Sequence, residues 1–336
     1  MRCLSRPRES SVARAGAILF LLLIGPLFVL PALAQQTGWE REWPQTDFSR
    51  HAVDLSEILS GGPPRDGIPS IDAPEFVTIA EAGLPPLEPV ISVLVGGVAR
   101  AYPLRVMMWH EIVNDTVGGV PLAITYCPLC NTGIVFQRAL GEQLLDFGTT
   151  GKLRNSDLVM YDRQTESWWQ QFTGRAIVGE MTGTTLEPWP SRLESMALFA
   201  QRHPDGLVLV PSSPGSRAYG ANPYVGYDRR STPYDFFEGD LPQGIAPLAR
   251  VVRVEETAWS LDLLRDLGRI EHGDLVLTWQ PGQVSALDER VIAQSFDVGN
   301  VVVQRLTQSG PVDVPYSVDF AFAFHAFYPD APIVTE

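Results

Sequence analysis

The sequence predicts a mainly β fold of the α+β class, with few short helices and mostly antiparallel sheet. Three observations lead to this prediction. Short apolar runs bounded by Gly, Pro, Asn or Asp recur along residues 89–213, at the length of strands rather than of helices. Paired glycines stand between such runs, as two-residue hairpin turns require. The runs do not alternate with long amphipathic helices, so βαβ units are not expected.

The first 34 residues have the composition of a secretory leader. Four arginines precede an apolar run that is broken by Pro26 and Pro31 and ends in Ala-Leu-Ala. A basic start, an apolar centre and a small-x-small end are the parts of a Sec-type signal peptide. We therefore expect cleavage after Ala34 and a periplasmic or secreted protein. A retained membrane anchor is the alternative, but the prolines favour a removed leader, and no stable membrane span is expected after cleavage.

Cleavage leaves an acidic chain with two cysteines. The whole sequence has 25 Lys and Arg against 39 Asp and Glu; without the leader's four arginines and one glutamate these become 21 and 38, a net charge of −17. Such a charge repels nucleic acid and anionic lipid, so no nucleic-acid partner is expected. Cys3 leaves with the leader, and two remaining cysteines cannot form a disulfide framework.

Four segments are expected after the leader. Residues 35–88 are rich in Pro and Gly and predict an N-terminal arm, with at most one short helix near Asp54–Leu59. Residues 89–213 predict a β-rich unit one, and residues 214–246 an ordered linker with many aromatic side chains. Residues 247–336 predict a second β-rich unit.

The sequence of unit one predicts the following elements in chain order. Residues 90–102 form a hairpin around Gly96-Gly97, and PLRVMMW at 103–109 forms a short helix. A turn at Gly118-Gly119 leads into the next strand, and residues 132–151 have a hairpin pattern. Further strands are expected in SDLVMYD, SWWQQF, RAIVGEM and GLVLVPS, and a helix ended by Pro204 is expected in SRLESMALFAQRHP.

Unit two resembles a degenerate copy of unit one. Four segments of unit one have similar counterparts in the same order, so we expect an internal duplication. When PLAITYCPLCNTGIVFQR is aligned with DLVLTWQPGQVSALDER, Gln280 and Gln283 stand where unit one has its two cysteines. Leu267 stands at the position of His110. The chemistry is therefore expected in unit one.

The strongest functional pattern is WHEIVNDTVGGVPLAITYCPLCN at residues 109–131. Two thiolates three residues apart in a turn can face one ion, and the glycine turn folds their strand back beside His110. Cys127, Cys130 and His110 are therefore the candidate ligands of a copper or zinc ion, because both metals accept sulfur and nitrogen donors. Candidates for the fourth ligand are Glu111, Met108 and Met160, with Asp115, Met107, His203 or water as further options.

Two other interpretations of the cysteine pair remain open. Export exposes a Cys-x-x-Cys pair to oxidation, so the pair could serve a thiol–disulfide oxidoreductase. The cysteines could instead be buried thiols that pack a turn in a structural or interaction protein. If the protein turns over a substrate, Asp157, Asp162 and Arg163 are the candidate catalytic residues, because their segment has no counterpart in unit two.

Three long motifs carry a resemblance to a known family. AYPLRVMMWHEIVNDTVGGVPLAITYCPLCNTGIVFQR, FGTTGKLRNSDLVMYDRQTESWWQQFTGRAIVGE and YGANPYVGYD follow one another over most of residues 89–230. This combination resembles the bacterial and archaeal family called domain of unknown function 3179, and the C-terminal FAFHAFYPD is similar to that family's ending. The resemblance implies export and a Cys-x-x-Cys with a nearby His-Glu. It implies no established activity.

The sequence as a whole predicts an exported protein that binds copper or zinc and delivers or stores it. Its expected partner is an unidentified periplasmic protein that donates or accepts the metal. A metalloenzyme using the same residues is the alternative. Binding without turnover is favoured over it, because no general base, nucleophile triad or cofactor fingerprint emerges from the sequence.

Overall fold

The computed structural model describes residues 38–336, so the expected leader, residues 1–34 with Cys3, lies outside the described part. All the sheets belong to one compact unit, Glu40–Glu336. The unit is mainly β, and among its named strands only the pairs β4–β16 and β18–β24 are parallel. Within residues 38–336, no helix has the length and apolar character needed to cross a membrane. The predicted class, mainly β with mostly antiparallel sheet, is confirmed.

The predicted hairpin lies at the centre of a five-stranded sheet with the order β15-β3-β4-β16-β2. Val95 pairs with Val98 across the turn, and both intervening glycines have positive φ, as the sequence predicted. The segment predicted as one helix before Pro204 is divided, because its first five residues extend the sheet and the helix begins only at Met196. The elements of this layer are β2 (Glu75–Thr78), α2 (Ile79–Ala82), β3 (Pro89–Val95), β4 (Val98–Pro103), β15 (Ser191–Ser195), α4 (Met196–Arg202) and β16 (Leu207–Val210).

A four-stranded sheet with the order β14-β7-β6-β5 carries the cysteine pair. The short helix predicted in PLRVMMW precedes it as α3, and the turn at Gly118-Gly119 joins β5 to β6. β6 ends at Cys127, which pairs with Thr132 at the start of β7, so Cys130 lies in the tight connection between these strands. The elements are α3 (Leu104–His110), β5 (Ile112–Val117), β6 (Val120–Cys127), β7 (Thr132–Gln137) and β14 (Pro188–Trp189).

The next sheet has the order β1-β10-β11-β12-β13. Residues 132–151 do not form one hairpin as predicted: β7 pairs with β6 and β14, β10 pairs with β1 and β11, and only the two-residue strands β8 and β9 form a hairpin. The Arg138 guanidinium donates to the carbonyls of Asp115 and Leu145, and so fixes the chain where it passes between the two sheets. The elements are η1 (Leu55–Glu57), β1 (Ile58–Ser60), β8 (Ala139–Leu140), β9 (Gln143–Leu144), β10 (Phe147–Arg154), β11 (Asp157–Asp162), β12 (Trp168–Gln170) and β13 (Arg175–Val178).

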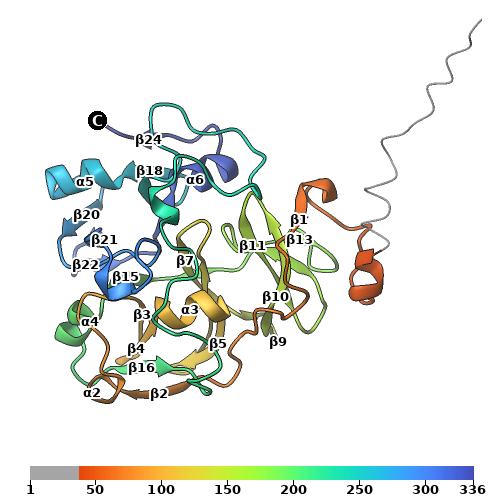
Figure 1. The fold of residues 1–336 in the computed structure, drawn as a ribbon, viewed down its shortest axis with the longest axis horizontal. Coiled ribbons are helices and arrows are strands. Elements are labelled where there is room, and N and C mark those ends of the chain that lie inside the picture. Colours follow the sequence, from red (N-terminus) through yellow and green to blue (C-terminus); the bar gives the residue numbers. More distant parts are fainter. Residues whose placement is uncertain (1–37) are drawn as a thin grey trace, which may run out of the picture. The chain divides into compact units, whose positions relative to one another are not determined.

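The second half follows the same connection order as the first. β23 is antiparallel to β17 and β24 is parallel to β18, just as β15 is antiparallel to β3 and β16 is parallel to β4. A further sheet has the order β19-β20-β21-β22 and lies with α5 at one end of the unit, opposite β10, β11 and β13 (Figure 1). The elements are β17 (Arg250–Val254), β18 (Thr257–Ser260), α5 (Leu261–Leu267), β19 (Arg269–His272), β20 (Leu275–Gln280), η3 (Ile292–Gln294), β21 (Asn300–Thr307), β22 (Gly310–Asp313), β23 (Ser317–Phe320), α6 (Ala321–Phe327) and β24 (Ile333–Val334).

A long loop joins the halves between β16 and β17. It contains one short 3₁₀ helix, η2 (Tyr227–Arg229), and no named strand over residues 214–246, where the sequence predicted a linker. Tyr227 is fully buried and its ring stacks on Tyr234 with the centroids 4.4 Å apart. Buried aromatic rings therefore hold this loop against the core.

Candidate metal centre

Cys127, Cys130 and Asp157 form one buried cluster. Their ligand atoms, two sulfurs and one carboxylate oxygen, all lie within 4.8 Å of one another. Both cysteines are free thiols with exposed fractions of 2% and 0%, and Asp157 is fully buried. Thiolate and carboxylate are both ligands of divalent metals, so the cluster offers three ligand atoms to one ion.

The cysteine turn is held in place by the second half of the chain. Asn131 has a left-handed φ of 54°, which Asn tolerates better than most residues and which turns the chain sharply into β7. Its side-chain amide donates to the Val318 carbonyl at 2.9 Å, and the Phe320 N–H donates to the Cys130 carbonyl at 2.9 Å. Strand β23 thus fixes the position of Cys130 from nearly two hundred residues away.

Asp157 approaches the cysteines from the start of β11. The Asn-Ser turn before it has positive φ at both residues, the conformation of a tight hairpin turn. The Asp157 Oδ2 atom accepts hydrogen bonds from Gln170 Nε2 at 2.6 Å and from the Phe172 N–H at 2.9 Å. Its Oδ1 atom is buried and has no hydrogen-bond partner among residues 38–336. A buried acceptor without a partner is costly, and a bound cation would offset that cost.

Glu111 lies beside this cluster in a strained backbone conformation. It caps the C-terminus of α3 with φ 58° and ψ −31°, a region that costs a non-glycine residue about 1–3 kcal/mol. Its side chain is buried, and its carboxylate forms no hydrogen bond or salt bridge with any residue of 38–336. No hydrogen bond or ion pair of the Glu111 side chain with residues 38–336 offsets the cost of the backbone strain and of the buried carboxylate. The residue is therefore a candidate for function.

Burial controls the protonation of these four groups. It raises the pKa of Glu111 to about 8, with the charge of Asp157 adding to the effect. It raises the pKa of Asp157 to about 7, against the hydrogen bonds from Gln170 and Phe172. Burial also raises the pKa of both thiols. Burial therefore favours the neutral form of each group, and a bound cation would favour the deprotonated form, which metal ligation requires.

Glu111 and Cys127 line a cavity of about 340 Å³. The long loop between β16 and β17 contributes the aromatic part of its wall, with Tyr224, Tyr234 and Phe236. The loop is fastened to the cysteine turn, because the Tyr227 hydroxyl donates to the Leu129 carbonyl at 3.0 Å. A small molecule would thus approach Cys127 through a cavity with mostly apolar and aromatic walls.

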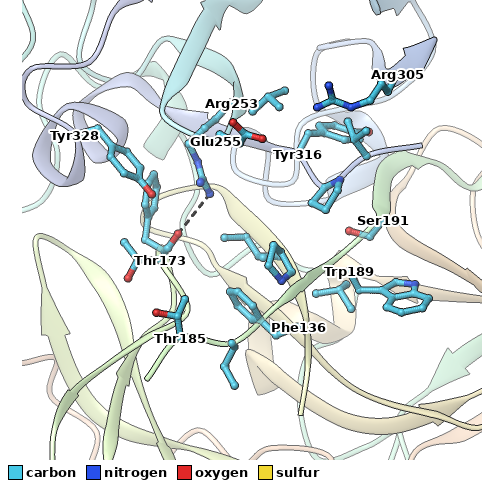
Figure 2. A pocket seen from close by; sticks show the side chains of 18 residues that line it. Phe136, Thr173, Thr185, Trp189, Ser191, Arg253, Glu255, Arg305, Tyr316 and Tyr328 are labelled. Carbon is cyan, nitrogen blue, oxygen red and sulfur yellow. Dashed lines mark hydrogen bonds between the residues drawn. The ribbon is translucent and has the colours of Figure 1, made fainter. Parts of the chain in front are cut away.

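A larger cavity of about 430 Å³ is lined by residues of both halves (Figure 2). Its charged lining residues are Arg253, Glu255 and Arg305, and no cysteine or histidine lines it. Both arginines are already paired: Arg253 Nε lies 2.8 Å from Asp319, and Arg305 Nη1 lies 2.7 Å from Asp274. Of these two cavities, only the smaller one is therefore lined by a member of the cysteine cluster.

His110 is not part of the cluster. Its Nδ1 lies 2.7 Å from the Pro69 carbonyl oxygen and its Nε2 lies 2.7 Å from the Tyr219 hydroxyl, so both ring nitrogens have partners elsewhere. The glycine turn does place β5 beside β6, since Ile112 pairs with Thr125. However, His110 belongs to the last turn of α3 and contacts the N-terminal arm, and Asp157 completes the group of ligand atoms instead.

Of the three main candidates for a fourth ligand, one lines the cavity and two do not. Glu111 lines the cavity together with Cys127. Met108 and Met160 are buried in the apolar core and do not line that cavity. Glu111 is therefore the candidate that the fold brings to the open side of the cluster.

The three candidate catalytic residues also lie in different settings. Asp157 is in the cluster, whereas Asp162 accepts a hydrogen bond from the Trp169 indole N–H at 2.8 Å and caps a turn. Arg163 forms ion pairs at 3.2 Å with Asp66 and with Asp72. The partners of Asp162 and Arg163 are thus structural, and neither residue lines the smaller cavity.

Two parts of the site were not predicted from the sequence in their present role. Asp157 was a candidate catalytic residue rather than a ligand, and the aromatic wall was considered only as a linker. The sequence did contain a signal for Asp157, because its segment has no counterpart in unit two. No comparable signal connects the loop tyrosines to Cys127, since that contact depends on the tertiary fold.

A family model described as a protein of unknown function, DUF3179, matches residues 65–331. This range includes Glu111 and all three members of the cluster. No curated protein and no solved structure matches the chain.

Proposed function

The chain belongs to the DUF3179 family of proteins of unknown function, and we propose from its own residues that it is an exported protein that binds one zinc ion through Cys127, Cys130 and Asp157. Export is supported by the leader pattern of residues 1–34. The single observation that carries the metal site is the convergence of three buried ligand atoms within 4.8 Å.

The spacing of the ligand atoms supports a shared ion. Donors bound to one tetrahedral zinc at ordinary bond lengths lie roughly 3.8 Å apart or less. The observed limit of 4.8 Å therefore requires only small side-chain adjustments. The Oδ1 atom of Asp157 has a lone pair that no donor in the described part of the chain uses.

The donor types favour zinc over copper. Two cysteine sulfurs alone would suit Cu(I), but a carboxylate oxygen is a harder ligand that zinc accepts more readily. Neither Met108 nor Met160 lines the cavity, so no soft thioether ligand from these residues favours copper there. The low exposure of Cys127 and Cys130 also favours a retained ion over one that is delivered or stored, because transfer to a partner needs accessible ligands.

We also infer that the two halves arose by duplication and that only the first kept a site. The end of β6 at Cys127 corresponds to the end of β20 at Gln280. The shared connection order of the two halves supports this interpretation, because chance rarely repeats a hairpin flanked by one antiparallel and one parallel strand. Unit two would then act as scaffold, consistent with the hydrogen bonds from β23 to the cysteine turn.

Metal analysis of the chain purified without chelator tests the proposal. We expect close to one zinc per chain, and we expect Cys127→Ser, Cys130→Ser and Asp157→Asn each to weaken zinc binding at least tenfold. Asp274→Asn is the matched control, because that carboxylate is exposed and pairs with Arg305. Circular dichroism of each variant shows whether the sheets remain. Full zinc occupancy in folded Cys127→Ser and Asp157→Asn would reject the site.

A thiol–disulfide oxidoreductase is the second candidate function, because a carboxyl group beside Cys127 could accept its proton. In that reaction the two thiols lose two electrons and two protons, which a partner's disulfide gains as two thiols. Thiol titration before and after a reductant separates the cases. A reversible loss of both thiols without bound metal supports the redox function, whereas two thiols protected by zinc support the metal site.

A further inference from the structure

We propose that the cavity beside Cys127 binds small uncharged molecules that combine an apolar body with one nitrogen or sulfur donor atom. The donor atom would occupy the remaining coordination position of the ion. This inference therefore rests on the proposed metal site and names the class of molecule that the site accepts.

One side of the cluster faces the cavity. Cys127 lines it, whereas Cys130 and Asp157 do not. An ion held by these three residues would therefore be enclosed on two sides and open toward the chamber. Zinc sites with three protein ligands leave the fourth position to water or to an added ligand, whereas closed structural sites use four protein ligands.

The walls of the cavity fit an apolar body. Ile68, Leu129, Leu153 and Leu158 line it together with the tyrosines and the phenylalanine of the long loop. Its volume of about 340 Å³ falls in the range of small-molecule sites, which are mostly apolar with a few polar groups at one end. Phe236 is 36% exposed, so it lies at the edge where a ligand would enter.

The polar end of the cavity disfavours anions. Glu111 and Cys127 line it, and a carboxylate oxygen of Asp157 lies within 4.8 Å of the Cys127 sulfur, so the ionisable groups around Cys127 are acids. The one cation in the wall, Lys152, is already paired with Glu42 at 3.1 Å. Two thiolates and one carboxylate around Zn²⁺ leave the site with a net charge of about −1, which disfavours a negatively charged ligand, whereas the Glu111 carboxyl group can hydrogen-bond to a neutral one.

The backbone beside the cavity is shaped to leave this space. The pairing of β10 with β11 shifts register between Thr149 and Lys152, and β-bulges of this kind are frequent next to binding sites. Gly151 in the bulge has φ 70°, and a Cβ atom there would lie 2.0 Å from the Pro63 carbonyl oxygen. Only glycine therefore permits this approach of the arm to the cavity wall.

Calorimetric titration of the zinc-loaded protein with 4-phenylimidazole tests the inference. The probe has one nitrogen donor and an apolar ring, so we expect it to bind at least tenfold more tightly than imidazole. Benzoate, which has a similar body and a negative charge, should bind at least tenfold more weakly than 4-phenylimidazole. Substitution of zinc by cobalt(II) adds a direct readout, because a ligand that reaches the ion changes the visible absorption spectrum.

Two variants locate the bound probe. Phe236→Ala should reduce the advantage of 4-phenylimidazole over imidazole about tenfold. Phe296→Ala, which changes a similarly exposed phenylalanine outside the cavity, should leave that advantage unchanged. These results support a ligand site that opens onto the ion.

A failure of the cavity inference and a failure of the proposed metal site give different results. If the protein binds zinc but 4-phenylimidazole binds no better than imidazole, or benzoate binds equally well, the cavity inference is overturned and the metal site stands. If the protein binds no zinc in the metal analysis, the proposed function fails and the inference fails with it. An unchanged cobalt spectrum at saturating probe also overturns it, because the donor atom then does not reach the ion.

Discussion

Glu111 and Gly268 occupy corresponding places in the two halves of the chain. Each caps a seven-residue helix with positive φ, at 58° and 70°, and each N–H donates to the carbonyl four residues earlier. The carbonyl of Glu111 accepts from the Tyr126 N–H, as that of Gly268 accepts from the Trp279 N–H. The second half uses the residue suited to this conformation, and the first half carries a buried glutamate there instead.

We predict that Glu111→Gly stabilises the metal-free protein. The change relieves the left-handed strain and removes an unpaired buried carboxyl group, so the free energy of unfolding should rise by about 1 kcal/mol. Urea unfolding in the presence of a chelator measures it. The control is Gly268→Ala, which introduces the same kind of strain in the second half and should lower the free energy by about 1 kcal/mol. A less stable Glu111→Gly variant would mean that the glutamate is structural.

His110→Ala should leave the zinc content unchanged. Its ring nitrogens are engaged by Pro69 and Tyr219 rather than by the cluster, so its loss should weaken the attachment of the arm and loop. We expect the free energy of unfolding to fall by about 1–2 kcal/mol. Metal analysis and urea unfolding of the same preparation check both parts. Loss of zinc from a folded His110→Ala variant would restore the histidine as a ligand.

Asp157→Asn should separate binding from folding. An asparagine can still accept the hydrogen bonds from Gln170 and Phe172, while the unpartnered oxygen becomes an amide that cannot ligate. The metal-free variant should therefore unfold within about 1 kcal/mol of the parent, although zinc no longer protects it. Thermal unfolding with and without zinc measures both. Equal stabilisation by zinc in parent and variant would remove Asp157 from the ligand set.

The ion pair of Arg192 and Asp313 should contribute stability that is lost in acid. The guanidinium contacts both carboxylate oxygens at 2.6 Å and joins β15 to β22. Partial burial acts to raise the pKa of Asp313, but the hydrogen bonds from Arg192 outweigh it and hold that pKa below its ordinary value of 3.8. A lowered pKa favours the folded state above pH 3.8, and this contribution disappears as the pH falls through the folded value.

Arg192→Gln tests this pair. At pH 7 we expect a loss of about 1 kcal/mol in the free energy of unfolding, and at pH 3 a smaller difference from the parent. Arg305→Gln serves as the control, because its pair with Asp274 is exposed and should contribute little at either pH. A loss that is equal at pH 7 and pH 3 would show that Arg192 acts through packing alone.

Local patterns in the sequence predicted the elements that local chemistry determines. The hairpin around Gly96-Gly97, the helix α3 and the turn before β6 were all placed correctly, because glycine pairs and apolar spacing act over a few residues. The hairpin predicted within residues 132–151 is confirmed only for the two-residue strands around its turn, because the longer flanking strands pair with two different sheets. The helix predicted from Ser191 began too early for the same reason, because β3 pairs with its first five residues.

The candidate site was predicted in part. The two cysteines follow from their spacing, which a turn alone can satisfy. The choice between His110 and Glu111 depends on where one short helix ends, and a shift of one residue turns a side chain to another face. Asp157 and the loop tyrosines come from distant segments, and only the packed sheets place them beside Cys127.

The contact between β23 and the cysteine turn has a consequence for how the chain matures. Synthesis delivers the amino-terminal half first, and Val318, which accepts the hydrogen bond from Asn131, follows 187 positions later. Until that strand arrives, the hydrogen bonds of Val318 and Phe320 with the cysteine turn cannot form. The order of chain emergence thus makes the cysteine turn one of the last parts of the chain to reach its final hydrogen bonding.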